Sequence, residues 1–258
     1  MLLVMDVGNS HTKIGLFDGE SLVANWRLVT TSGRTTDELR VMLTALLAQE
    51  DVSTQSVTGC CIASVVPPVN LTIESVCKTL FRVTPLFVVP GVRTGITIKV
   101  ENPKEVGADR IANSVAAVEE FGGPAIVVDL GTATKFEVIS ENAEYLGGVI
   151  APGIQISADA LFDRCAKLAR IEIVTPDRVI GKDTVSHICA GLTYGNADMV
   201  DGLVARIAHE MRATPKVIAT GGFAPLIGPL CRRVDHIDPL LTLKGLRAVF
   251  VKNEKAAV

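Results

Sequence analysis

The chain has 258 residues, of which 48% are hydrophobic, and its net charge is −3. This size and apolar content predict a folded protein of one large or two small domains, and the scattered Lys and Arg residues exclude the basic stripe that nucleic-acid binding requires. No apolar run approaches the ~20 residues of a membrane span, no signal peptide is recognised, and the six cysteines lack C-x-x-C spacing. We therefore expect a cytoplasmic protein with reduced thiols and with no nucleic-acid or membrane partner.

The first part of the chain alternates runs typical of strands and helices. In chain order, we expect strands at 2–5, 12–17 and 21–30, a helix at 35–50, a strand at 57–67, a helix at 69–81 and a strand at 85–89. The helix at 35–50 begins with Thr36 or Asp37 as its cap. A helix is expected after Gly107, and a strand at 216–220 runs into Gly221 and Gly222.

The opening pattern occurs a second time near the middle of the chain. D-V-G-N-S-H-T-K-I from Asp6 aligns with D-L-G-T-A-T-K-F-E from Asp129, and each segment follows a buried strand. Chance similarity of two buried strands is the alternative, but strand, Asp, Gly, polar cluster and strand is an unusual order for simple turns. We therefore expect an internal duplication, with similar α/β domains at residues 1–115 and 116–258.

The two Asp-Gly turns indicate a nucleotide site. Tight turns present backbone amides to anions, and Ser10, Thr12, Thr132 and Thr134 can add hydroxyl donors. A carboxylate beside a phosphate needs a cation between them, and Mg²⁺ binds one or two carboxylates together with phosphate oxygens and water. If the turns face each other, they can hold Mg²⁺ and a nucleoside triphosphate in a cleft between the domains. Neither G-x-x-x-x-G-K-[ST] nor a strand-linked G-x-G-x-x-G occurs.

A second polar cluster lies between the halves, in E-V-G-A-D-R-I-A-N. Arg110 can clamp a phosphate or a carboxylate, and Asp109 can accept a proton from an attacking hydroxyl. The alternative is structural, with Asp109 as a helix N-cap in a solvated ion pair.

Seven segments together resemble type III pantothenate kinases over nearly the whole chain. In order, they are D-V-G-N-S, S-V-V-P, N-P-K-E-V-G-A-D-R-I-A-N, V-V-D-L-G-T-A-T, Y-L-G-G-V-I-A-P-G-I-Q-I-S-A-D-A-L, I-G-K-D-T-V and A-T-G-G. The resemblance implies a duplicated ribonuclease-H-like (actin-like) fold with a nucleotide cleft and a homodimer. It also implies ATP-dependent phosphorylation of pantothenate to 4′-phosphopantothenate, the first step of coenzyme A biosynthesis.

The same resemblance implies residue roles. Asp109 would be the general base, Asp6 would hold Mg²⁺, and Asp129 would coordinate a monovalent cation, K⁺ or NH₄⁺. The ATP and Mg²⁺ site would comprise Asp6, Val7, Gly8, Asn9, Ser10, His11, Thr12, Lys13, Thr132, Gly221 and Gly222. The pantothenate site would comprise Val100, Gly107, Ala108, Asp109, Arg110 and Thr184, the last of these at the dimer interface.

Several positions depart from the family pattern. Val100 stands where the family usually has tyrosine, Lys135 follows G-T-A-T, and C-A-K-L-A at 165–169 and C-A-G at 189–191 replace T-A-K-L-P and Q-S-G. One interpretation is drift with retained activity, and another is a non-catalytic nucleotide-binding regulatory paralogue of the Bvg-accessory-factor type. A third interpretation is that the chain is another actin-like kinase, acting on a sugar or a carboxylate.

Lys135 suggests a more specific hypothesis about the monovalent cation. If its side chain turns inward, its ammonium can replace the monovalent cation expected at Asp129. Alternation along the strand can equally direct it to solvent.

Overall fold

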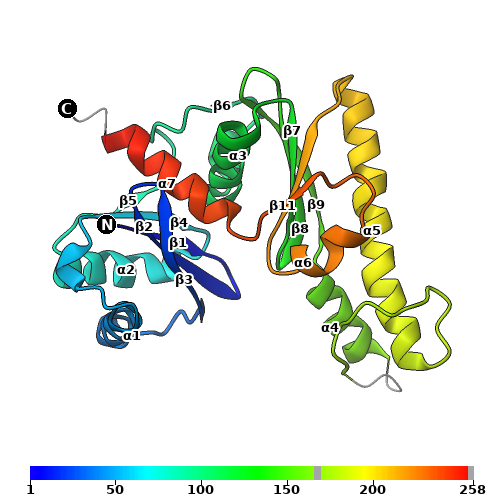
Figure 1. Ribbon diagram of the computed structural model, residues 1–258, viewed down its shortest axis with the longest axis horizontal. Coiled ribbons are helices and arrows are strands. Elements are labelled where there is room, and N and C mark those ends of the chain that lie inside the picture. Colours follow the sequence, from blue (N-terminus) through cyan, green and yellow to red (C-terminus); the bar gives the residue numbers. More distant parts are fainter. Residues whose placement is uncertain (166–169, 255–258) are drawn as a thin grey trace. The chain divides into compact units, whose positions relative to one another are not determined.

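The computed structural model describes residues 1–165 and 170–254, which form two compact units. Unit 1 comprises Met1–Ile96, Glu101–Ala116 and the chain from Thr242 onward, and unit 2 comprises Thr97–Val100 and Ala117–Leu241. The chain therefore passes between units near the expected boundary, after Ala116, but it returns at residue 242. The C-terminal helix α7 (Leu241–Glu254), red in Figure 1, is thus part of unit 1 except for its first residue.

Unit 1 contains a five-stranded sheet in the order β3-β2-β1-β4-β5. Its strands are β1 (Leu2–Val7), β2 (His11–Asp18), β3 (Ser21–Val29), β4 (Gly59–Ser64) and β5 (Leu86–Phe87). The first three form an antiparallel meander, whereas β4 runs parallel to β1 and β5 parallel to β4. Its helices are α1 (Thr36–Gln49), α2 (Asn70–Val76), the start of α3 (Ala108–Phe121) and nearly all of α7. The five strands and two helices expected before residue 90 are present, although the second helix ends as a π-helix at Cys77–Phe81.

The cap of α1 differs from the expectation. Thr35 is the N-cap: its hydroxyl accepts a bond from the Glu38 amide at 3.2 Å, and its own amide donates to Glu38 Oε2 at 2.7 Å. Thr36 and Asp37 lie inside the helix, so assigning the cap to either of them was wrong. The reciprocal bonds of a capping box require the glutamate three residues after the cap, and only Thr35 has that spacing.

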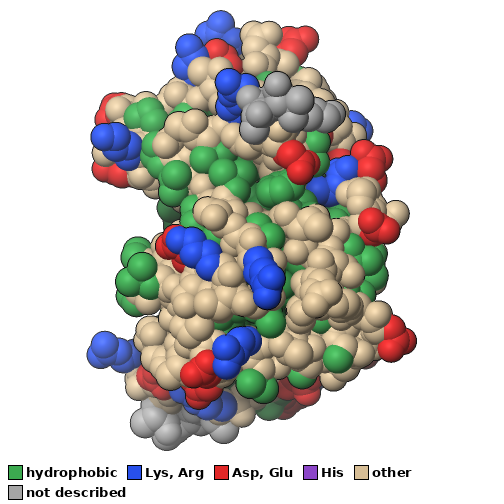
Figure 2. All heavy atoms as spheres, turned by 90° about the vertical axis from the view of Figure 1, so that its left-hand side faces the viewer, with side chains coloured by type: hydrophobic (Ala, Val, Ile, Leu, Met, Phe, Trp, Pro, Cys, Tyr) green, Lys and Arg blue, Asp and Glu red, His purple; other side chains and the backbone are tan. Residues whose placement is uncertain are grey.

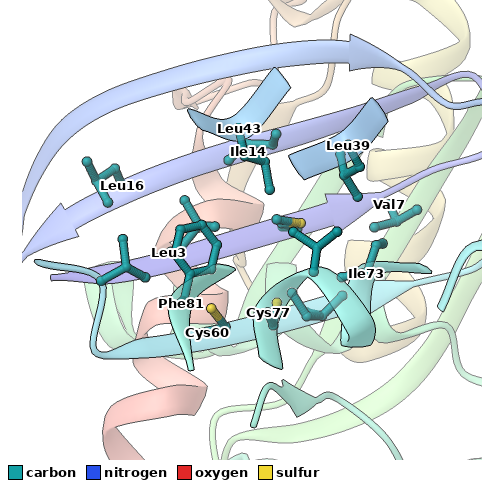
Figure 3. Close-up of a cluster of buried hydrophobic side chains, with 14 of the residues drawn as sticks. Leu3, Val7, Ile14, Leu16, Leu39, Leu43, Cys60, Ile73, Cys77 and Phe81 are labelled. Atoms are coloured by element: carbon teal, nitrogen blue, oxygen red, sulfur yellow. The ribbon is translucent and has the colours of Figure 1, made fainter. Parts of the chain in front are cut away.

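The core of unit 1 lies between the sheet and helices α1 and α2 (Figure 3). Leu39 and Leu43 of α1 contact it at helical spacing, and Leu3 and Ile14 contribute from the sheet. The thiol of Cys61 is also buried in unit 1, and burial raises its pKa to about 12. Such a thiol stays protonated at neutral pH and packs as a small apolar group.

Glycines let α7 approach the rest of unit 1. A methyl group on Gly245 would overlap the Ala112 carbonyl of α3, and one on Gly59 would overlap the Phe250 ring. The Thr242 hydroxyl also hydrogen-bonds Asn113 Oδ1 at 2.7 Å in a fully buried position. These contacts attach the C-terminal helix to the unit that contains the N-terminal strands.

Unit 2 contains a six-stranded sheet in the order β11-β10-β7-β8-β9-β6. Its strands are β6 (Thr97–Ile98), β7 (Ala125–Leu130), β8 (Ala133–Ile139), β9 (Glu144–Pro152), β10 (Lys216–Thr220) and β11 (His236–Ile237). Its helices α4 (Ile154–Arg164), α5 (Thr184–Met211) and α6 (Ala224–Ile227) contribute to a core over one face of the sheet. Figure 1 shows the long helix α5 beside this sheet.

The two sheets share one topology. Strands β9-β8-β7-β10-β11 reproduce the order β3-β2-β1-β4-β5, with the same antiparallel and parallel pairings, and unit 2 adds β6 at its edge. The backbone register is also shared, because Asp6 pairs with Lys13 across β1 and β2 as Asp129 pairs with Lys135 across β7 and β8. The expected duplication of an α/β, ribonuclease-H-like domain is confirmed.

Candidate active site

The first Asp-Gly turn lies between β1 and β2 at one end of the unit 1 sheet. Asp6 is half-buried near the end of β1, and the turn is closed by a bond from the Gly8 amide to the His11 carbonyl at 3.0 Å. Asn9, Ser10 and His11 are exposed. The turn is tethered from its other side, because the Thr30 amide donates to the Ser10 carbonyl at 3.0 Å. A fixed backbone with exposed polar residues is suited to receive an anion.

Asp109 lies at this same end of unit 1. The Val65 amide, just past β4, donates to the Val7 carbonyl at 3.1 Å, so the ends of β1 and β4 are adjacent. Gly107 borders this edge, because a methyl group added there would be 3.6 Å from Val65 Cγ1 and 2.5 Å from Asp109 Oδ1. The structure therefore brings the Asp109 carboxylate to the sheet end that holds the Asp6 turn.

Asp109 belongs to helix α3 and does not precede it. The helix begins at Ala108, and the Ile111 amide donates to the Gly107 carbonyl at 3.1 Å, so Gly107 precedes the first turn. Treating Asp109 as the N-cap is therefore wrong. Ala108 is buried, and both Asp109 and Arg110 are half-buried. A carboxylate and a guanidinium near a helix N-terminus are suited to orient a polar substrate.

The second Asp-Gly turn gathers glycines at one end of the unit 2 sheet. Asp129 pairs with Thr220 across parallel strands, and the Phe223 amide donates to the Leu130 carbonyl at 3.0 Å. Gly221, which has a φ of +96°, thereby packs against Asp129 Oδ1 and the Leu130 backbone. Gly222 is exposed beside it. This strand end leaves room for close approach of a ligand.

Gly153 and Thr30 contact these turns, and neither was predicted as a site residue from the sequence. Gly153, at the start of α4, packs so closely on the Thr132 carbonyl that a methyl group would overlap it. Its signal was the P-G pair between a strand and a helix. In unit 1, the Thr12 and Thr30 hydroxyls lie 2.9 Å apart, which fixes the base of the first turn. No local pattern marks that contact, because it joins two strands.

Lys135 turns inward. Its Nζ lies 2.8 Å from Asp129 Oδ2, with 16% of the lysine side chain and 13% of the aspartate side chain exposed. The solvent-facing alternative for this lysine is therefore wrong. Because directly opposed residues of an antiparallel pair point to the same face, the β7–β8 register accounts for the contact.

The remaining predicted substrate residues lie at different places in unit 2. Val100 follows β6, which pairs with the first residues of β9, and it lies beside Gly147. Thr184 is exposed at the first position of α5, after its cap residue Asp183. Figure 1 shows the start of α5 near α4, which follows the far end of β9. Unit 2 by itself does not bring Val100 and Thr184 together.

Two further departures from the family pattern begin at Cys165 and Cys189 of unit 2. Cys189 is buried in α5, where its thiol contacts the Glu172 carbonyl at 3.6 Å, whereas Gly191 is exposed. Cys165 follows α4 directly, and residues 166–169 of C-A-K-L-A lie outside the described residues.

A small cavity lies behind the first turn. It is lined by Thr12, Thr30 and Arg34 together with apolar core residues, and its volume is about 30 Å³. That is room for about one water molecule. The cavity is therefore too small for a nucleotide.

Residues 1–165 and 170–254 contain neither a cluster of metal-binding side chains nor a helix that could span a membrane. No group of three or more His, Cys, Asp or Glu side chains there is arranged to hold a metal ion. None of the helices in this part of the chain has the length and apolarity to cross a bilayer. Figure 2 shows acidic and basic side chains interspersed on the visible face.

Relatives match nearly the whole chain. The model of the type III pantothenate kinase family matches residues 2–206. A type III pantothenate kinase from Halalkalibacterium halodurans is 49% identical over 98% of this chain and 100% of its own length. Another from Geobacillus kaustophilus is 48% identical over 98% of each. A solved structure from Campylobacter jejuni, named for the Baf family of transcriptional activators, has a TM-score of 0.63 and 18% identity, covering 98% of this chain and 99% of that one. The last likeness concerns the fold alone.

Proposed function

The chain belongs to the type III pantothenate kinase family, and we propose that it transfers the γ-phosphoryl group of ATP to the terminal hydroxyl of pantothenate. The observation that carries this proposal is the position of Asp109 at the sheet end that holds the Asp6 turn. Phosphoryl transfer needs an anion-binding loop, a cation site and a group that orients the attacking alcohol. Unit 1 has candidates for all three.

ATP phosphates are assigned to the turn from Val7 to Lys13. Its exposed Asn9, Ser10 and His11 offer polar contacts, and Lys13 adds positive charge. Asp6 fits Mg²⁺ because a single carboxylate at a strand end, completed by phosphate and water, is the donor set that this ion favours. When bound, Mg²⁺ would neutralise charge on the phosphates. For unit 2, we propose nucleotide contacts through Thr132, Gly221 and Gly222.

Asp109 is assigned as the general base. The transferred group carries little covalent bonding at the loose transition state, so the carboxylate mainly orients the hydroxyl and accepts its proton late. Gly107 leaves room for this carboxylate, because a methyl group there would lie 2.5 Å from Asp109 Oδ1. Arg110 is suited to bind the pantothenate carboxylate as a two-pronged donor.

Val100 and Thr184 are assigned to pantothenate, and we propose that Thr184 acts in a homodimer. Thr184 is exposed and has exposed apolar neighbours: Val179, Ile180 and Val185 are 65%, 76% and 49% exposed. Such side chains are candidates for burial against a second copy of the chain. Ile180→Glu would then shift the species seen by sedimentation toward the monomer, while Leu71→Glu, at an apolar side chain of unit 1 that is 78% exposed, would not. A monomeric native protein would overturn the dimer.

We place the reaction in the cytoplasm, where ATP is available and thiols stay reduced. All six cysteines are free, as is usual in a reducing compartment.

The regulatory alternative is not favoured, because relatives at 49% identity are named as kinases and the residues Asp6, Asp109 and Asp129 are all present.

ADP release from Mg-ATP, measured with and without pantothenate, tests the proposal. We expect release to depend on pantothenate, and Asp109→Asn to lower the rate by about 10²–10⁴-fold. Asp18→Asn, at an exposed carboxylate at the end of β2, is the control and should leave the rate unchanged. Nucleotide binding without transfer to pantothenate would favour a regulatory protein, and release only with another alcohol would favour a different kinase.

A further inference from the structure

The Asp129–Lys135 ion pair is short and largely buried. The Nζ–Oδ2 distance is 2.8 Å, and the side chains are 16% and 13% exposed. By contrast, the Lys78–Glu74 pair of unit 1 has a similar length of 2.6 Å, but its side chains are 51% and 38% exposed. Ion pairs on the surface contribute little and are screened by salt. A buried carboxylate depends far more on its counter-charge.

Both oxygens of Asp129 are held by close contacts. Oδ1 is enclosed by backbone, since a methyl group would lie 2.6 Å from it on Gly221 and 3.2 Å from it on Gly131. Oδ2 contacts the Lys135 ammonium. The carboxylate thus lies in a cradle formed by Gly131 and Gly221 at Oδ1 and by the Lys135 ammonium at Oδ2.

The surrounding face of the sheet adds a second acid. Glu137 lies two residues beyond Lys135 on β8, so it points to the same face, and it is completely buried. Lys135 therefore shares one face of the sheet with two carboxylates. Without its ammonium, this face would hold two acids, a combination that attracts a cation.

The residues around Asp129 do not fit the monovalent cation expected from the resemblance. A free ion at Oδ2 would have to displace a tethered ammonium, which has the same charge and the same chemistry as NH₄⁺. Release of Lys135 would also leave its charge without Asp129 in a half-buried position. The charge of the Asp129 carboxylate is already matched by a side chain of the protein itself.

We propose that Lys135 is a resident counter-charge for Asp129, that it takes the place of an exchangeable K⁺ or NH₄⁺, and that it makes the kinase independent of added monovalent cations. The proposal rests on the proposed function for its kinetic consequence, but not for its consequence for cation binding. Lys135 acts here as a positioning residue, because it holds a carboxylate beside the Gly221 turn.

Two measurements on the full-length protein test this inference. Thermal unfolding is followed in KCl and in tetramethylammonium chloride at equal ionic strength, and ADP release is measured in the same salts. The native protein should show the same unfolding midpoint and, within about twofold, the same rate in both salts. Lys135→Thr should gain cation dependence, with a midpoint at least about 3 °C higher in KCl and a rate raised about tenfold by K⁺.

Lys78→Thr is the matched control, because it removes a lysine from an equally short but exposed pair, and it should behave like the native protein in both salts. Strong K⁺ activation or K⁺ stabilisation of the native protein would overturn the proposal, and that result needs no variant to fold. A folded Lys135→Thr protein that ignores K⁺ would also contradict it. If the native protein transfers nothing to pantothenate in any salt, the proposed function fails, while the unfolding data still decide the inference.

Discussion

The β1–β2 turn of unit 1 and the β7–β8 turn of unit 2 are built on the same hairpin but differ in what surrounds their aspartate. Both place Asp opposite Lys in an antiparallel pair. In unit 1, the turn carries three consecutive exposed residues, Asn9 to His11. In unit 2, the turn is one residue shorter, and glycines enclose Asp129 while Lys135 covers it. A duplicated fold can thus leave one turn exposed and cover the aspartate of the other with an internal ion pair.

The largest expected effects come from replacing the two aspartates, and the two replacements should affect different properties. Asp6→Asn should lower the rate of ADP release by about 10²–10³-fold, because we propose that this carboxylate holds Mg²⁺, and it should cost less stability than the same change at Asp129. Asp129→Asn should instead lower the free energy of unfolding by about 2–4 kcal/mol, because it leaves the Lys135 ammonium half-buried without its carboxylate. Kinetics and urea unfolding of both variants measure the contrast. Equal losses of stability would show that the turns do not differ in this way.

The next effect concerns the glycine that encloses Asp129. Gly221→Ala should lower the free energy of unfolding by about 2–4 kcal/mol, because it combines a φ of +96° with overlap on Asp129 and Leu130. Gly19→Ala is the control in unit 1, since Gly19 also has positive φ, +57°, but has no atom within 4 Å of an added methyl group. It should cost only about 1 kcal/mol. If both variants unfold at the same urea concentration, the cradle around Asp129 is not tightly packed.

The smallest effect compares helix caps. The pKa of Asp183, at the start of α5, is lowered mainly by the hydrogen bond from the Ser186 amide and also by the one from the Ser186 hydroxyl. The pKa of Glu38 in α1 is lowered mainly by the hydrogen bond from the Thr35 amide and also by the one from the Thr35 hydroxyl. A carboxyl whose pKa is lower in the folded state stabilises the fold above its ordinary pKa, and this stabilisation is lost as the pH falls through the folded-state value.

Asp183→Asn should therefore flatten the loss of stability below about pH 4, because asparagine still accepts the cap bond but does not titrate in this range. Glu38→Gln should flatten it similarly in unit 1. Urea unfolding at several pH values measures both slopes. Slopes identical to that of the native protein would show that these caps do not contribute to acid unfolding.

The sequence predicted the features that repeat locally. Strand periodicity and the two aligned Asp-Gly segments identified the duplicated α/β fold, which the structure confirms, whereas the role expected for Asp109 in the G-A-D-R segment stays a prediction. The cap of α1 was misplaced by one or two residues, because several adjacent polar residues can cap a helix and only the reciprocal bond between Thr35 and Glu38 selects one.

Features that depend on distant contacts were not predicted. Alternation along β8 shows that Lys135 and Glu137 share a face, but not that the face is buried, because burial depends on packing from elsewhere in the chain. The approach of Gly245 to the Ala112 carbonyl joins residues far apart in the sequence. Nothing in the local pattern of α7 indicates that partner.

The central claim is that the Asp6 turn and Asp109 form the working end of a pantothenate kinase. Mass spectrometry of the product, with ADP measured in the same reaction, tests it most directly. We expect one phosphorylated pantothenate for each ADP, with the phosphate on the terminal hydroxyl, and nearly none with Asp109→Asn. ADP formed without phosphorylated pantothenate, or full product formation by Asp109→Asn, would contradict the account.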